Sequence, residues 1–237
     1  LAGFAAEAPY GPGSVLGIGG RDPEAVLRYH GALGNLLEMD DVHRGAILHP
    51  GPIVIPAALV AAEQHGADAF AFLDAVTRGY EATIRVGRAL GAPHYRYWHT
   101  TSTAGAFGAA AAVASILHLD APALADALGT AGSRAGGLWQ FRHETVPTKS
   151  LVNADAARSG WLAAQLAARG VRGPRSILEG PQGLIAATAP QAVVDGMGYG
   201  MGPFPTLVSE RELGRILAPF PELQVPGETY HALVPLA

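Results

Sequence analysis

Between residues 54 and 169, small and apolar residues recur at intervals of three and four positions, and no sustained two-residue alternation appears. This period is that of helices with one buried face, whereas strands alternate at every second residue. Within the stretch, the alanine run at 109–112 would let neighbouring backbones approach closely. The sequence therefore predicts an all-α fold, a helical bundle arranged around a central helix that begins near Thr103.

Capping residues predict where the other helices begin and end. We expect four of them, over residues 56–64, 69–91, 121–128 and 154–168. Proline suits the first turn of a helix, and aspartate or asparagine accepts hydrogen bonds from the free N–H groups at its start. The expected starting residues are Pro56, Asp68, Asp120 and Asn153, and the expected helix-ending residues are Gly66, Gly91 and Gly170.

The two ends of the chain differ from this helical stretch. Residues 1–20 are rich in glycine and proline, and residues 203–237 contain six prolines with one helix candidate at 209–217. Such compositions are typical of peripheral or extended segments. We expect one helical domain over residues 1–190, and a proline-rich segment over 191–237 that is part of it or peripheral to it.

Composition excludes several classes of protein. With 49% hydrophobic and only 15% charged residues, the chain should bury a large core rather than stay disordered. It has no cysteine, which excludes disulfides, thiolate zinc sites and iron–sulfur clusters. A formal charge of −4 does not indicate binding to nucleic acid. The sequence has no run of 18 apolar residues, so no membrane span is predicted. Without an export signal, a cytoplasmic location is expected.

The first polar cluster lies at residues 38–49, where glycine and proline break the helical pattern and predict a loop. It contains Glu38, Asp40, Asp41, His43 and His49. Reactive side chains often lie on such loops, although a solvated helix end with a loop histidine would give the same pattern. A metal site made of Asp41, His43 and His49 matches no standard ligand spacing, so no metal is expected.

Two more clusters lie before predicted helix starts. In residues 94–103, Ser102 or Thr103 could cap the central helix, so that its free N–H groups point to the place beside His99 where a carboxylate would bind. Ordinary capping beside an aromatic wall that includes Trp98 is the alternative. The cluster at 142–149 ends in Lys149, the single lysine of the chain, which supplies a compact ammonium group. Chance alone could also explain that lysine.

If these helix starts meet at one end of the bundle, they form a cationic pocket for a small polycarboxylate. Histidine as acid or base and lysine as charge stabiliser suit the removal of a proton beside a carboxylate. The sequence has no phosphate-binding glycine loop, no dinucleotide fingerprint after a strand and no serine elbow. No cofactor is therefore expected.

Several motifs occur in the order found in one known family. They are the asparagine-led stretch 34–43, His49-Pro50-Gly51, the segments 56–63 and 79–81, His99-Thr100-Thr101 with 105–110, and Thr148-Lys149 with 156–164. Over roughly residues 13–190, the sequence thereby resembles the MmgE/PrpD family. This family includes 2-methylcitrate dehydratase, cis-aconitate decarboxylase and iminodisuccinate epimerase.

The resemblance implies a mostly helical large domain, a homodimer, and cofactor-independent chemistry on di- or tricarboxylic acids. By this analogy His49 and His99 move protons, Lys149 holds a carboxylate, and Asp40 and Asp41 orient the histidines. Dehydration is favoured over decarboxylation or epimerisation. The residues expected to contact the substrate are His43, Thr100, Thr101 and Ser102.

The sequence also departs from the family pattern. Val42 stands where threonine is common and Val152 where histidine often follows the lysine, so substrate contacts are expected to differ. Family members are longer and have a smaller α/β domain that closes over the site, whereas residues 191–237 are too few to form it. We therefore expect this lid domain to be absent from residues 1–237, either because it lies outside this sequence or because this is a shortened member with an open or altered pocket. The alternative function is a non-catalytic or partner-dependent member that acts as a ligand-binding or structural subunit.

Overall fold

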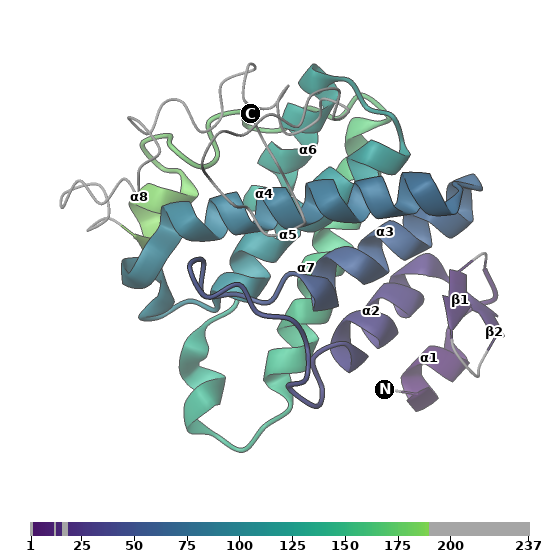
Figure 1. The fold of residues 1–237 in the computed structure, drawn as a ribbon, viewed down its shortest axis with the longest axis horizontal. Coiled ribbons are helices and arrows are strands. Elements are labelled where there is room, and N and C mark those ends of the chain that lie inside the picture. Colours follow the sequence, from purple (N-terminus) through teal and green to yellow (C-terminus); the bar gives the residue numbers. More distant parts are fainter. Residues whose placement is uncertain (1, 12, 16–18, 190–237) are drawn as a thin grey trace.

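The computed structural model describes residues 2–11, 13–15 and 19–189, and helices make up most of them (Figure 1). The all-α prediction is confirmed. The strands of this part of the chain form a two-stranded antiparallel ribbon, in which Gly13 lies opposite Arg21. In chain order the elements are α1 (Ala2–Glu7), β1 (Gly13–Val15), β2 (Gly19–Arg21), α2 (Pro23–Leu33), α3 (Gly51–His65), α4 (Ala69–Tyr95), α5 (Thr100–Ile116), α6 (Ala121–Gly132), the 3-10 helix η1 (Trp139–His143), α7 (Thr148–Ala167) and α8 (Leu184–Thr188).

Helix α5 is the predicted central helix. Every residue in it except Ser115 is buried, and it packs against α3, α4, α6 and α7. Its small side chains allow this packing. A Cβ atom placed on Gly108 would lie 2.6 Å from the carbonyl oxygen of Gly79 in α4, and one placed on Gly160 in α7 would lie 2.4 Å from that of Ala106. Only glycine permits these two backbone approaches.

Three predicted helix starts are wrong. Helix α3 begins at Gly51 and contains Pro56 in its interior, α5 begins at Thr100 with His99 as its N-cap, and α7 begins at Thr148. In α5, Thr103 lies inside the first turn and its hydroxyl donates back to the carbonyl of His99. Each helix thus starts three to six residues earlier than its local sequence suggests.

Other predicted boundaries are confirmed. The carboxylate of Asp68 accepts a hydrogen bond from the Ala71 N–H at the start of α4, and Asp120 does the same at the start of α6. Gly66 ends α3 in the left-handed conformation. At Gly91 the backbone leaves helical geometry, with φ 59° and ψ −162°, so a kink separates the last turn of α4 from the predicted helix. Helix α6 continues four residues past its predicted end, to Gly132.

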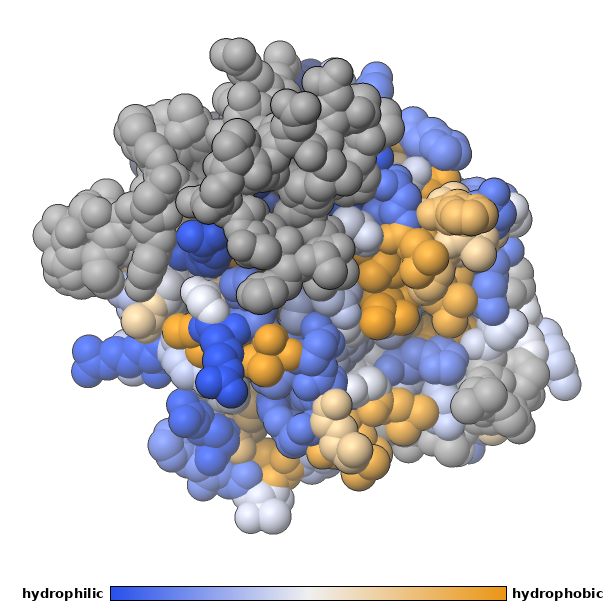
Figure 2. All heavy atoms as spheres, in the orientation of Figure 1, coloured by the Kyte–Doolittle hydropathy of each residue, from blue (hydrophilic) through white to orange (hydrophobic). Residues whose placement is uncertain are grey.

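The N-terminal residues are peripheral, as expected, but are not simply extended, because they form α1 and the ribbon at one edge of the bundle (Figure 1). The helix predicted at 209–217 and the segment 191–237 lie outside the described residues. Figure 2 shows apolar side chains gathered over α3 and the first half of α4, where Ile55, Phe70 and Leu73 are exposed. Within the described ranges, no helix is long and apolar enough to cross a membrane.

Candidate functional site

The loop between α2 and α3 holds His49 beside a buried carboxylate. His49 Nδ1 lies 3.2 Å from Oδ2 of Asp40, an ion-pair distance. The side-chain amide of Asn35 donates to both oxygens of Asp40, at 2.9 and 3.0 Å. The backbone N–H of His49 donates to the hydroxyl of Thr101 in α5, at 3.1 Å. Asp40 can therefore orient the imidazole of His49, and Asn35 holds Asp40 in place.

Asp41 fastens the same loop to two helices. Its Oδ1 accepts a hydrogen bond of 3.1 Å from the N–H of Gly51, the first residue of α3, and its side chain is also hydrogen bonded to Tyr80 in α4. Burial raises the pKa of Asp41, although both hydrogen bonds favour the charged form. Burial and the charge of Asp41 raise the pKa of Tyr80 well above its ordinary value. These contacts give Asp41 a positioning role in the loop.

His99 lies at the N-terminus of α5 and is 1% exposed. Its Nδ1 is buried and has no hydrogen-bond partner. Burial, followed by the charges of Lys149, His49 and His94, lowers the pKa of His99 to about 3. The imidazole is therefore neutral at pH 7. A neutral, buried imidazole with a free nitrogen can accept a proton from a bound molecule.

The segment before α7 covers His99. The N–H of His99 donates to the carbonyl of Gly137 at 2.8 Å, and the N–H of Trp139 donates to the carbonyl of Tyr97 at 2.9 Å. This short antiparallel pairing places the centroid of the Trp139 ring 4.5 Å from that of the His99 ring, and the centroid of the Phe141 ring 5.7 Å from it. Two aromatic rings thus contact the imidazole.

Lys149 brings the third predicted cluster to this place. It lies in the first turn of α7, and its ammonium group forms an ion pair with Glu38 of the α2–α3 loop. The charges of Lys149 and His49 contribute to the lowered pKa of His99, and the backbone N–H of His49 is bonded to Thr101, two residues after His99, so both residues lie near the imidazole. The structure therefore brings His49, His99 and Lys149 together from three separate segments of the chain.

The predicted substrate-contacting residues differ in their hydrogen bonding. The hydroxyl of Thr100 is buried without a partner, whereas Thr101 accepts from His49 and Ser102 donates to the carbonyls of His99 and Gly136. His43 Nδ1 accepts a hydrogen bond from the N–H of Ala46 within its own turn. Of the three hydroxyls, that of Thr100 is the one left to bind another molecule.

Sequence reasoning gave no site role to several residues that shape this region. Asn35 holds Asp40, Tyr80 holds Asp41, and Trp139 covers His99. His94 is fully buried and makes hydrogen bonds of 2.8 Å to Thr103 and 2.7 Å to Thr188. Burial lowers the pKa of His94 to about 4. The local signals were the position of Asn35 in the same asparagine-led stretch as Asp40 and that of Tyr80 in the motif segment 79–81.

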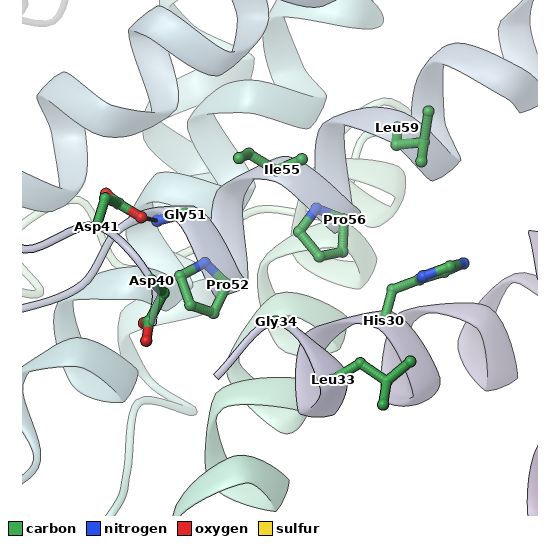
Figure 3. Close-up of a pocket in the computed structure, with 10 residues that line it drawn as sticks. All are labelled: His30, Leu33, Gly34, Asp40, Asp41, Gly51, Pro52, Ile55, Pro56 and Leu59. Carbon is green, nitrogen blue, oxygen red and sulfur yellow. Dashed lines mark hydrogen bonds between the residues drawn. The ribbon is translucent and has the colours of Figure 1, made fainter. Parts of the chain in front are cut away.

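A cavity of about 450 Å³ opens beside this site, between α2 and α3 (Figure 3). Asp40 and Asp41 lie at one end of it, and apolar side chains such as Leu33, Ile55 and Leu59 line its length. The histidines and the lysine of the site do not line it. No group of three or more histidine, aspartate or glutamate side chains is placed to hold a metal ion within the described part of the chain.

Comparison with known proteins adds two findings. Residues 6–196 match the family model of the MmgE/PrpD N-terminal domain. The chain is 34% identical over 181 residues to a cis-aconitate decarboxylase-like protein, oryM, of Aspergillus oryzae, which covers 72% of this chain and 37% of that protein. It is 30% identical over 179 residues to a cis-aconitate decarboxylase of Aspergillus terreus, covering 72% of this chain and 36% of the relative. The chain thus spans about a third of the length of these curated relatives.

Proposed function

Because the chain belongs to the MmgE/PrpD family, we propose that it forms the proton-transferring part of a lyase that acts on a small di- or tricarboxylic acid. The observation that carries this proposal is the meeting of His49, His99 and Lys149 at one end of the bundle. Two proton carriers and a cation are what proton transfer beside a carboxylate requires. No part of this chemistry calls for a cofactor.

His99 is the proposed proton carrier at the reacting carbon. In the free protein its pKa of about 3 keeps the imidazole neutral and able to accept a proton. A bound acid would bring negative charge next to the ring, and a nearby negative charge raises the pKa of an imidazole. Binding of the acid would therefore make His99 a stronger base at the moment when a proton is to be moved.

His49 is the proposed second proton carrier, at the leaving group. Its Nδ1 lies 3.2 Å from Oδ2 of Asp40, so the carboxylate can hold the imidazole in place while His49 passes a proton. Lys149 is the proposed ligand for a substrate carboxylate and for the negative charge that develops on it. It already binds a carboxylate, that of Glu38, so the acid would compete with or join this ion pair.

These roles fit two reactions. In a decarboxylation the C–C bond to a carboxylate breaks, CO₂ leaves, and the carbon that keeps the electron pair takes up a proton, which His99 can donate once it has been protonated in the complex with the acid. In a dehydration a proton is removed beside a carboxylate, and the hydroxyl on the neighbouring carbon leaves as water after protonation. The names of the curated relatives favour decarboxylation of an acid such as cis-aconitate, while dehydration is what we expect from the sequence.

The proposal is tested by proton NMR in deuterium oxide, with the 237-residue chain incubated separately with cis-aconitate, citrate and 2-methylcitrate. We expect solvent deuterium to enter one of these acids or its product. His99→Gln should abolish this incorporation, and the matched variant His65→Gln, at the far end of α3, should retain it. Melting temperatures of both variants report on folding.

Absence of exchange with every acid, in a folded sample, would refute a catalytic role for this chain on its own. It would favour the alternative of a ligand-binding or partner-dependent subunit. The homodimer and the cytoplasmic location expected from the sequence stay predictions, and sedimentation velocity tests the first of them.

A further inference from the structure

Several buried side chains have polar atoms without a hydrogen-bond partner, and three of these residues, His99, Thr100 and Trp139, lie next to one another. Among the described residues other than arginines, such atoms belong to Asn35, His99, Thr100, Trp139 and Asn153, and to His49, whose Nδ1 faces Asp40 at an ion-pair distance. Folded proteins pair more than nine in ten of their buried polar groups, so a group of unpaired atoms in one region requires an explanation. Asn35, His49, His99 and Thr100 belong to the proposed site. Trp139 and Asn153 have no role in it so far.

The indole N–H of Trp139 is a donor held in a fixed place. The Trp139 ring packs at 4.5 Å on His99, and its backbone is bonded to Tyr97, so the side chain is fastened from two sides. Its Nε1 is buried and unpaired. Trp161 in α7 shows the ordinary arrangement, because its Nε1 donates to Oε1 of Gln64 at 2.9 Å. An indole nitrogen only donates, so the missing partner of Trp139 is an acceptor.

Asn153 offers a second set of unpaired groups from α7. It is fully buried, and both its amide nitrogen and its amide oxygen lack a partner. It lies one helical turn after Lys149 and two turns before Gly160, the residue that touches α5. Residues at these spacings share one face of a helix, so Asn153 lies on the α5-facing side of α7, below the ammonium group of Lys149.

The charges nearby select the kind of acceptor. The guanidinium of Arg142 lies 5.0 Å from the centre of the Trp139 ring, and Lys149 lies close enough to lower the pKa of His99. The Arg142 guanidinium against the Trp139 ring and the Lys149 charge near His99 make this region electropositive, which favours a negatively charged acceptor such as a carboxylate for the indole N–H.

We propose that Trp139 is a substrate-binding residue whose indole N–H donates to a carboxylate of the acid held between His99 and Lys149, with Asn153 as a second hydrogen-bonding group from α7. The identity of the ligand as a carboxylic acid rests on the proposed function. The placement of Trp139 and Asn153 rests on their burial, contacts and unpaired atoms alone.

The test is a titration followed by NMR of the tryptophan indole N–H groups, in the ¹⁵N-labelled chain. The probe is tricarballylate, a saturated tricarboxylate without a double bond or a hydroxyl group to react. Trp139→Phe keeps an aromatic ring on His99, removes the donor and assigns its resonance. Trp161→Phe is the matched control, because it removes an indole N–H that already has a partner.

We expect the Trp139 indole resonance to shift and to saturate with tricarballylate, while that of Trp161 stays in place. Trp139→Phe should raise the Kd about tenfold, since a hydrogen bond to a charged group is lost, and Asn153→Ala should also raise it. Trp161→Phe should leave the Kd unchanged. Should Trp139→Phe fail to fold, Trp98→Phe and Trp161→Phe assign the Trp139 resonance by elimination, and its shift in the unmodified chain still decides the question.

Two results would overturn the inference. If other signals of the site shift and the Trp139 resonance does not, the acid binds in the site without contacting Trp139. If no signal shifts at millimolar tricarballylate, the site does not bind carboxylates. Neither result depends on turnover. Deuterium incorporation with an unmoved Trp139 resonance refutes the role of Trp139 alone, and a saturating shift without incorporation refutes the catalytic proposal alone.

Discussion

Lowering the pH from 7 to 5 should reduce the free energy of unfolding by about 4 kcal/mol, because two histidines are buried in the neutral form. His94 is held between Thr103 and Thr188, and His99 lies under Trp139. Burial lowers the pKa of His94 to about 4 and that of His99 to about 3, from 6.5 in the unfolded chain. The unfolded chain therefore binds protons that the folded chain excludes.

These pKa values determine the sign and size of the change in the free energy of unfolding. The contribution of the two neutral histidines to the free energy of unfolding is complete above the unfolded pKa of 6.5. It is lost as the pH falls from there towards the folded pKa values of about 4 and about 3. One pKa unit corresponds to about 1.4 kcal/mol. Between pH 7 and pH 5 the unfolded histidines become almost fully protonated while the folded ones stay neutral, so each contributes about 2 kcal/mol of the loss.

Urea denaturation followed by circular dichroism at pH 7 and pH 5 measures this change. Glutamine does not titrate, so His94→Gln and His99→Gln should each remove about half of the pH dependence, and the double variant most of it. Asp41 and Glu81 act with the opposite sign, because burial raises their pKa values and lets the folded chain take up protons first. Both remain in every variant, so they do not affect the comparison. An equal pH dependence in the double variant would refute the assignment.

Two further predictions concern packing and the support of the site. Gly160→Ala should lower the free energy of unfolding by about 1–3 kcal/mol in urea denaturation, because the added carbon would meet α5. The control Gly3→Ala, whose added carbon meets no atom within 4 Å, should not lower it, and equal stabilities of the two variants would contradict the packing argument. Asn35→Ala should lower the free energy of unfolding by about 1–3 kcal/mol and reduce deuterium incorporation, since Asp40 loses the two hydrogen bonds from the Asn35 amide. Unchanged values in both assays would show that Asn35 does not hold Asp40.

The helical fold was predictable because its determinants are local. The spacing of apolar residues, the alanine run and the aspartate caps at 68 and 120 all act within a few residues. The wrong helix starts depend on contacts that local sequence does not contain. The first N–H of α3 is bound by Asp41, ten residues earlier, and α5 is capped by His99 without a side-chain hydrogen bond. Caps of these kinds become visible only in three dimensions.

The candidate site was predictable in its residues with acid–base chemistry and not in its other polar ones. His49, His99 and Lys149 stood out because histidine and lysine side chains carry or transfer protons, and Lys149 is the single lysine of the chain. Trp139 and Asn153 did not stand out, since tryptophan and asparagine occur in many packing and capping roles. What distinguishes them is an unpaired buried atom, a property of the folded state.

The composition of α5 sets the entropy of the candidate site. Its alanine and glycine side chains have no rotamers to lose, and the hydroxyls of Thr101, Ser102 and Thr103 at its start are held by hydrogen bonds, so the helix is already ordered before anything binds. The long side chains around it, Lys149, Glu38 and Arg142, do have such freedom. When an acid binds, the floor of the site will already be ordered, and the conformational entropy lost will come from this rim. Shortening the rim side chains should therefore change the entropy of binding, whereas enlarging those of the floor would change the fold.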